Sequence, residues 1–142
     1  MEASDILIET VKEYEGFRRC AYRDAAGVLT IGYGHTGRDV REGDRLTQCG
    51  AEQLLLLDLG DAVVAVRRLR VARTQGQFDA LVSFAFNVGI GRLQQSALLR
   101  VIRQGGSRAQ ITREFKRWVY GGGRRLPGLV RRREWEARRF FE

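Results

Sequence analysis

Residues 15–36 read EGFRRCAYRDAAGVLTIGYGHT, and they contain the most informative pattern of the chain. It contains the turn-forming run DAAG at residues 24–27, followed by the β-branched and aromatic run VLTIGY at residues 28–33. Ala21 and Tyr22 precede the turn. We therefore predict a small β-hairpin between about residues 20 and 34. Residues 35–46 carry few apolar anchors, which predicts a loop or a third short strand.

Helical patterns lie on both sides of this hairpin. Ser4-Asp5 supplies an N-cap for an amphipathic helix that ends near Glu15-Gly16, and Thr47 is the expected N-cap of a long helix reaching about Ala72. Further helices are predicted over residues 75–87, 91–104 and 107–119, and a last one carries Trp135, Phe140 and Phe141. Glycine-rich segments at residues 89–91, 105–106 and 121–123 separate them. This order predicts an α+β fold in one domain, with a β-containing lobe (about 16–46), a connecting helix (about 47–72) and a helical lobe (about 73–142).

Length and composition favour one soluble globular domain, since 142 residues with 44% apolar and 30% charged side chains can bury a sizeable core. Disordered, collagen-like and disulfide-scaffold classes are excluded. Cys20 and Cys49 predict free thiols or at most one bridge, which fits a reducing compartment. No apolar run approaches the roughly 20 residues of a membrane span, and the acidic start lacks the features of a secretory signal. We therefore expect no membrane insertion and a cytoplasmic chain.

Charge is distributed unevenly along the chain. Residues 1–66 carry 7 basic and 12 acidic side chains, whereas residues 67–142 carry 18 basic and 5 acidic ones, a net charge of +13. Nearly all of these cations are arginines, which favour bidentate contacts with carboxylates or phosphates. An anionic polymer is therefore the expected partner, and charge alone does not choose between nucleic acid, lipopolysaccharide and a cell wall that carries peptide carboxylates.

Three polar residues in and beside the hairpin are spaced so that they can converge. Glu15 ends the first helix, Asp24 lies nine positions later in the turn, and Thr30 lies six further on the returning strand. Each also has a purely structural interpretation. Glu15 could pair with Arg18 or Arg19, Asp24 could simply close the turn, and Thr30 suits a strand by propensity.

In this context the sequence resembles the phage-type lysozymes, the endolysins or muramidases of glycoside hydrolase family 24. Their signature is a Glu, an Asp nine later and a Thr six after that, followed by Ile-Gly-Tyr-Gly-His, and every position is filled here. The match continues through FAFNVG at residues 84–89, SALL at 96–99, FKRWVYGG at 115–122 and GLVRRR at 128–133. The resemblance spans the whole chain and implies a lysozyme-like fold.

The resemblance also implies a chemistry. Breaking a glycosidic bond needs one neutral carboxyl group that protonates the leaving oxygen and one carboxylate that stabilises the transition state or activates water. By resemblance Glu15 is the general acid, Asp24 is the ionised partner, and Thr30 orients the attacking water or bonds Asp24. The implied reaction is hydrolysis of the β-1,4 bond between N-acetylmuramic acid and N-acetylglucosamine, with no cofactor and no metal. Inversion is expected, which requires carboxyl groups roughly 6.5 to 9.5 Å apart.

Substrate-binding residues are expected beyond this triad. Gly32 and Tyr33 are candidates for a cleft wall because glycine within a strand often marks the close approach of a ligand, and His35 is expected to form structural hydrogen bonds near the cleft. In the second half of the chain the candidates are Phe86, Asn87, Gly89 and Arg132. Phe86 also fits a core position. The arginine-rich region from Arg124 to Arg133 could bind peptide carboxylates or other wall anions, or it could be a solvated face with helix-end charges.

The resemblance also implies partners, namely the glycan strands of peptidoglycan and, indirectly, a phage holin that lets the enzyme out of the host cytoplasm for lysis. The chain is expected to act as a monomer.

The sequence leaves three other functions open. A lytic transglycosylase would cut the same bond without water, and a basic nucleic-acid-binding module would account for the charge. A catalytically silent wall-binding relative is the third, although the intact Glu15, Asp24 and Thr30 favour activity.

Overall fold

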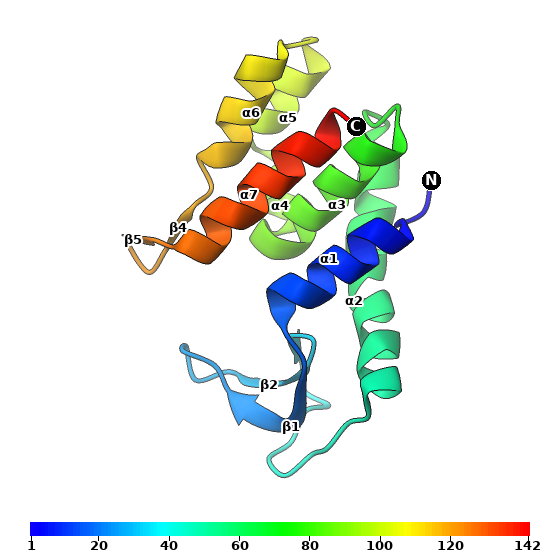
Figure 1. The fold of residues 1–142 in the computed structure, drawn as a ribbon, viewed down its shortest axis with the longest axis vertical. Coiled ribbons are helices and arrows are strands. Elements are labelled where there is room, and N and C mark those ends of the chain that lie inside the picture. Colours follow the sequence, from blue (N-terminus) through cyan, green and yellow to red (C-terminus); the bar gives the residue numbers. More distant parts are fainter. The chain divides into compact units, whose positions relative to one another are not determined.

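The computed structural model describes residues 1–142 and contains seven helices and five short strands (Figure 1). The helices are α1 (Asp5–Glu15), α2 (Gln48–Leu69), α3 (Gln75–Val88), α4 (Ile90–Gln94), α5 (Ala97–Arg103), α6 (Arg108–Lys116) and α7 (Pro127–Phe140). The strands are β1 (Arg18–Arg23), β2 (Leu29–Gly32), β3 (His35–Thr36), β4 (Tyr120–Gly121) and β5 (Arg124–Arg125). The predicted α+β class is confirmed.

Contacts within the chain divide it into two compact units. The β unit comprises Ile8–Asp61, and the helical unit comprises Met1–Leu7 together with Ala62–Glu142. The division falls inside α1 and inside α2, so each of these helices contributes residues to both units.

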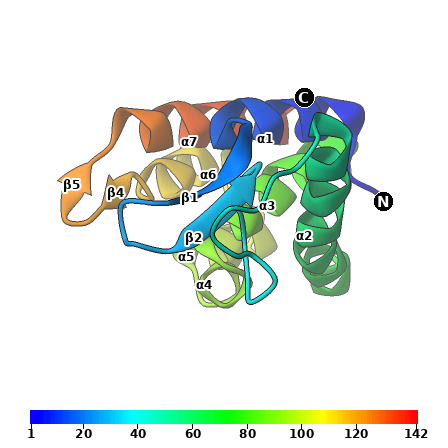
Figure 2. The same ribbon diagram turned by 90° about the horizontal axis from the view of Figure 1, so that it is seen from below.

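The β unit is built on an antiparallel sheet in the order β1-β2-β3. Figure 2 shows β1 and β2 side by side in this sheet. Tyr22 pairs with Thr30 across β1 and β2, and Thr30 pairs in turn with Thr36 on β3. The predicted hairpin is therefore present, and the third short strand, left open by the sequence, is formed. Buried apolar side chains of this unit come from helices and sheet alike, namely Val11, Ile31, Tyr33, Val40, Ala51, Leu55 and Leu59.

The helical unit is organised around α3 and α7, which lie side by side (Figure 1), with α6 packed against α7 and α5 against α6. A run of edge-to-face aromatic contacts joins three of these elements. The ring of Phe84 lies 5.7 Å from that of Phe115 and 5.5 Å from that of Trp118, and Phe115 lies 5.9 Å from Phe140. These contacts add to the burial of the rings and fix α7 against α3 and α6.

Helix starts were predicted better than helix ends. Thr47 caps α2, because its Oγ1 accepts a hydrogen bond from the N–H of Gly50 at 3.0 Å, and Ser107 forms a capping box with Gln110 at the start of α6. The end of α2 was placed wrongly at about residue 72. The helix stops at Leu69, since Arg70 adopts a left-handed conformation with φ +55°.

Two further predictions for the helical unit need correction. The single helix expected over residues 91–104 is divided into α4 and α5, because Ser96 accepts a hydrogen bond from the N–H of Leu99 and starts a new helix there. The expected helix over 107–119 ends at Lys116, and the glycine-rich break that follows is a hairpin of β4 and β5. Gly122 and Gly123 form its turn with φ of +57° and +78°.

Cys20 and Cys49 are exposed free thiols, so the alternative of a bridge between them is not realised. None of the helices combines the length and the apolar character that a membrane span requires.

Candidate active site

Glu15 is the last residue of α1, where the helix ends because Gly16 adopts φ +70° and donates its N–H to the carbonyl of Lys12 at 2.9 Å. The side chain is partly buried. Its carboxyl group lies against the backbone of Gly34, so closely that a Cβ atom on residue 34 would be 2.7 Å from Oε2. Gly34 has φ +76°, and thus both its backbone conformation and this contact require glycine. The turn after β2 therefore forms one wall around the carboxyl group of Glu15.

Asp24 occupies the turn between β1 and β2. Its Oδ1 accepts hydrogen bonds from the N–H groups of Ala26 and Val28, both at 2.9 Å, which fixes the carboxylate in an Asx turn. The turn-closing role considered from the sequence is thus real. Oδ2 makes no hydrogen bond within the chain, and the residue is exposed. One oxygen therefore holds the turn while the other is open to a water molecule or a substrate.

Thr30 lies on β2 and is 4% exposed. Its hydroxyl donates to the carbonyl of Val28 at 2.9 Å, and the same carbonyl accepts the N–H of Asp24 at 2.9 Å. The direct bond from Thr30 to Asp24, which the sequence allowed, is not formed. Instead, both residues are bonded to the backbone of Val28, which fixes their relative position. Because the hydroxyl proton is used in this way, the oxygen of Thr30 can act only as an acceptor toward any further group.

His35 begins β3 and is held on both sides by carboxylates. Nδ1 lies 2.8 Å from Asp58 Oδ2 on α2, and Nε2 lies 3.1 Å from Asp39 Oδ2 in the following loop. Burial acts to lower the pKa of His35, but the hydrogen bonds and negative charges of Asp58 and Asp39 outweigh it, and the pKa is raised. The imidazole therefore links α2 to the strand that follows Gly34, and the two carboxylates favour its protonated form.

The other two predicted residues of the β unit have clear packing roles. A Cβ atom on Gly32 would lie 3.1 Å from both Ala51 and Leu46, so glycine at 32 allows β2 to approach α2. Tyr33 is 4% exposed, stacks at a tilt on Phe17 with ring centroids 5.6 Å apart, and accepts a hydrogen bond from Gln48. Any contact of these two residues with a substrate remains a prediction.

The remaining predicted residues belong to the helical unit, and three of them stand near the end of α3. Phe86 is partly buried and Asn87 is exposed, and Gly89 ends the helix with φ +109° while donating its N–H to the carbonyl of Ala85. Arg132 on α7 is only 3% exposed, with hydrogen bonds from Nε and Nη2 to the hydroxyl and carbonyl oxygens of Ser83 at 3.4 and 3.3 Å. Arg132 therefore does not lie on a solvated face, which had been the alternative interpretation of this region.

Sequence reasoning missed the groups that hold these residues in place. Asp58 and Asp39 bind His35, and Glu136 and Arg133 form a buried ion pair on α7. A signal was present in each case, since Asp58 interrupts an apolar run at residues 54–59 and the pair on α7 is spaced i,i+3. Neither pattern indicates by itself whether the charge is buried.

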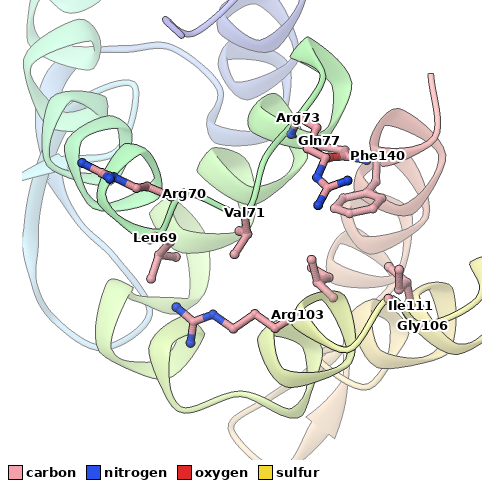
Figure 3. Close-up of a pocket in the computed structure, with 11 residues that line it drawn as sticks. Leu69, Arg70, Val71, Arg73, Gln77, Arg103, Gly106, Ile111 and Phe140 are labelled. Carbon is pink, nitrogen blue, oxygen red and sulfur yellow. Dashed lines mark hydrogen bonds between the residues drawn. The ribbon is translucent and has the colours of Figure 1, made fainter.

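A cavity of about 490 Å³ opens in the helical unit among Leu69, Arg73, Arg103 and Phe140 (Figure 3). None of the residues predicted for the site lines it. The chain also contains no group of three or more His, Cys, Asp or Glu side chains arranged to hold a metal ion.

The sequence of the whole chain and its fold agree with one family of proteins. The family model for phage lysozyme matches residues 12–136, and the chain belongs to this family. It is 42% identical over 144 residues to the endolysin of Bacillus phage B103, covering 99% of this chain and 54% of that protein. The chain thus spans about half the length of that relative.

Two solved structures share the fold over nearly their full length. The muramidase domain of SpmX from Asticaccaulis excentricus superposes with a TM-score of 0.89 at 38% identity, covering 99% of this chain and 98% of that one. The endolysin from Escherichia coli O157:H7 phage FAHEc1 superposes with a TM-score of 0.90 at 34% identity, covering 100% and 94%. The lysozyme-like fold expected from the sequence is therefore confirmed.

Proposed function

We propose that the chain is an endolysin that hydrolyses the β-1,4 bond between N-acetylmuramic acid and N-acetylglucosamine in peptidoglycan. The observation that carries this proposal is that Asp24 and Thr30 are both hydrogen-bonded to the backbone of Val28. The chain is a member of the phage lysozyme family, and it also has Glu15 at the end of α1. The names of the related proteins, an endolysin and a muramidase domain, support the same assignment.

In this mechanism Glu15 gives its proton to the glycosidic oxygen as the bond breaks. A water molecule on the other side of the sugar ring donates one O–H to Oδ2 of Asp24 and the other to Oγ1 of Thr30. This leaves a lone pair of the water free to attack the anomeric carbon. The proposal is supported by the hydrogen bonds already present, since Oδ2 is open and Thr30 is restricted to accepting. Asp24 takes up the proton as the new C–O bond forms.

Because a water held in this way lies between the carboxylate and the sugar, we propose hydrolysis with inversion, and not formation of a 1,6-anhydro end by transglycosylation. No cofactor takes part in these steps. The remaining predicted residues, Gly32, Tyr33, His35, Phe86 and Gly89, would shape the binding surface, and Arg132 would stabilise it through its bonds to Ser83. We further propose that the chain acts as a monomer and reaches the wall from the host cytoplasm after a phage holin opens the membrane.

The test is mass spectrometry of fragments released from purified Gram-negative peptidoglycan. Reducing muramic acid ends are expected, and 1,6-anhydro ends would overturn hydrolysis while leaving the substrate assignment intact. Glu15→Gln should abolish release while the thermal melting curve and binding to the insoluble wall remain close to those of the unmodified chain. Unchanged release by Glu15→Gln would remove Glu15 from the role of acid, and absence of release by the unmodified chain would refute the proposed function.

A further inference from the structure

A buried ionic cluster joins α7 to α3 in the helical unit. Arg133 and Glu136 are both 0% exposed, and Arg133 Nε lies 2.7 Å from Glu136 Oε1. The hydroxyl of Ser83 donates to the other carboxylate oxygen of Glu136 at 2.6 Å, and Arg133 Nη2 lies 3.2 Å from the same oxygen. The guanidinium carbon also lies 5.1 Å from the centroid of the Phe84 ring. The position of the Arg133 side chain is therefore determined from several directions.

This cluster reaches the surface at the side chain of Asn87. Arg133 Nη2 donates to Asn87 Oδ1 at 2.8 Å, and Nη1 donates to the carbonyl of Trp118 at 3.3 Å. Arginine has only donors, so the oxygen of the Asn87 amide must face it and the NH₂ group must face away. Asn87 is exposed, and its NH₂ group makes no hydrogen bond within the chain. The result is a fixed pair of N–H donors directed outward from the end of α3.

Packing alone does not account for the cluster. Burying an ion pair costs desolvation free energy, and apolar side chains of similar volume often hold such a position equally well or better. What an apolar pair could not do is fix the orientation of a surface amide. Such a group suits a ligand rich in oxygen acceptors, and the hydroxyl and acetamido groups of an N-acetylated glycan supply them.

We infer that Arg133, held by Glu136, is a positioning residue that orients the Asn87 amide as a hydrogen-bond donor to the glycan. This inference rests on the proposed function, because it takes peptidoglycan as the substrate. It assigns Arg133 a role in substrate binding that is exerted through Asn87.

Asn87→Asp is the first variant to measure. The carboxylate has nearly the same shape and can still accept from Arg133, but it offers no donor to the substrate. We expect kcat/KM on purified peptidoglycan to fall by about two- to twelvefold, the loss of one neutral hydrogen bond, with the melting temperature unchanged or raised. Gln94→Glu, the same amide-to-acid change at an exposed position of α4, serves as the control for the added charge and should keep full activity.

Arg133→Lys tests the coupling. Lysine keeps the positive charge beside Glu136, but its single ammonium group cannot reproduce the fork that reaches both Glu136 and Asn87. We expect Arg133→Lys to lower kcat/KM in the unmodified chain and to have no further effect in an Asn87→Ala background. Independent losses that multiply in the double variant would overturn the inference, since they would indicate a structural role for Arg133.

Full activity of Asn87→Asp would also overturn the inference that Arg133 orients the Asn87 amide toward the glycan. These outcomes differ from failure of the proposed function, in which the unmodified chain itself would release no fragments.

Discussion

The close approach of Gly34 to the carboxyl group of Glu15 can be tested by adding one methyl group. In Gly34→Ala the new Cβ atom would lie 2.7 Å from Glu15 Oε2, whereas ordinary contacts of this kind begin at 3.4 Å. The carboxyl group must therefore move by about 0.7 Å, or the turn must move by as much. Since Glu15 is the proposed acid, the displacement falls on the group that must reach the glycosidic oxygen.

Two effects are expected, and they have different sizes. A non-glycine residue in the left-handed region costs about 1–2 kcal/mol, which lowers the melting temperature by about 3–10 °C for a chain of this length. A displacement approaching 1 Å in a catalytic group can reduce the rate about 100-fold, so kcat/KM on peptidoglycan should fall by about that factor. At 25 °C the variant remains folded, so the loss of stability does not lower the amount of active enzyme. The fall in kcat/KM therefore reports the displacement of Glu15.

Gly43→Ala is the matched control. Gly43 has φ +84°, close to the +76° of Gly34, and a Cβ atom there would meet no atom within 4 Å. The same backbone strain is therefore introduced without contact to Glu15. Release of soluble fragments by both variants, measured below their melting transitions, separates strain from displacement. Equal activity of Gly34→Ala and Gly43→Ala would show that contact with Gly34 does not control the position of the Glu15 carboxyl group.

Three other perturbations have definite expected outcomes. Because the pKa of His35 is raised in the folded chain, the stabilisation it provides is fully present below about pH 6.5, the unfolded value, and is lost as the pH rises through the folded value. The difference in urea unfolding free energy between the unmodified chain and His35→Asn should accordingly shrink from pH 5.5 to pH 9, and a difference that grows would contradict this. Asp79→Asn should destabilise the helical unit by about 3 kcal/mol in urea unfolding, because it removes the buried charge that lies 2.8 Å from the guanidinium of Arg139 and leaves that group only the exposed carboxylate of Glu142. A change near zero would show that the buried pair contributes nothing. Thr30→Val should lower kcat by about 100-fold, whereas Thr30→Ser should retain most of the activity, because only a hydroxyl group at residue 30 can hold the attacking water. Equal kcat values for the two variants would exclude this role of the hydroxyl group.

Local sequence determined most of the secondary structure and the candidate triad. The turn at residues 24–27 and the run that follows it are short-range signals, so the hairpin and the positions of Asp24 and Thr30 on it could be predicted. Thr47 and Ser107 act through the backbone of the next three residues, which explains why the starts of α2 and α6 were predicted. Helix ends were less predictable, because no sequence signal marks Arg70 as the residue that adopts a left-handed conformation.

Which charged groups are buried, and which partners they have, follows from the folding of the whole chain and not from local sequence. The arginines and glutamates of α7 have the composition of a solvated helix face, yet Arg133 and Glu136 are fully buried because Ser83 and Asn87 on α3 supply partners from about 50 residues away in sequence. His35 likewise depends on Asp58, 23 residues later. The spacing of polar residues predicts which face of a helix is exposed to solvent only if those residues have no hydrogen-bonding or charged partner on another element. Such a partner reaches its place only when the whole chain folds.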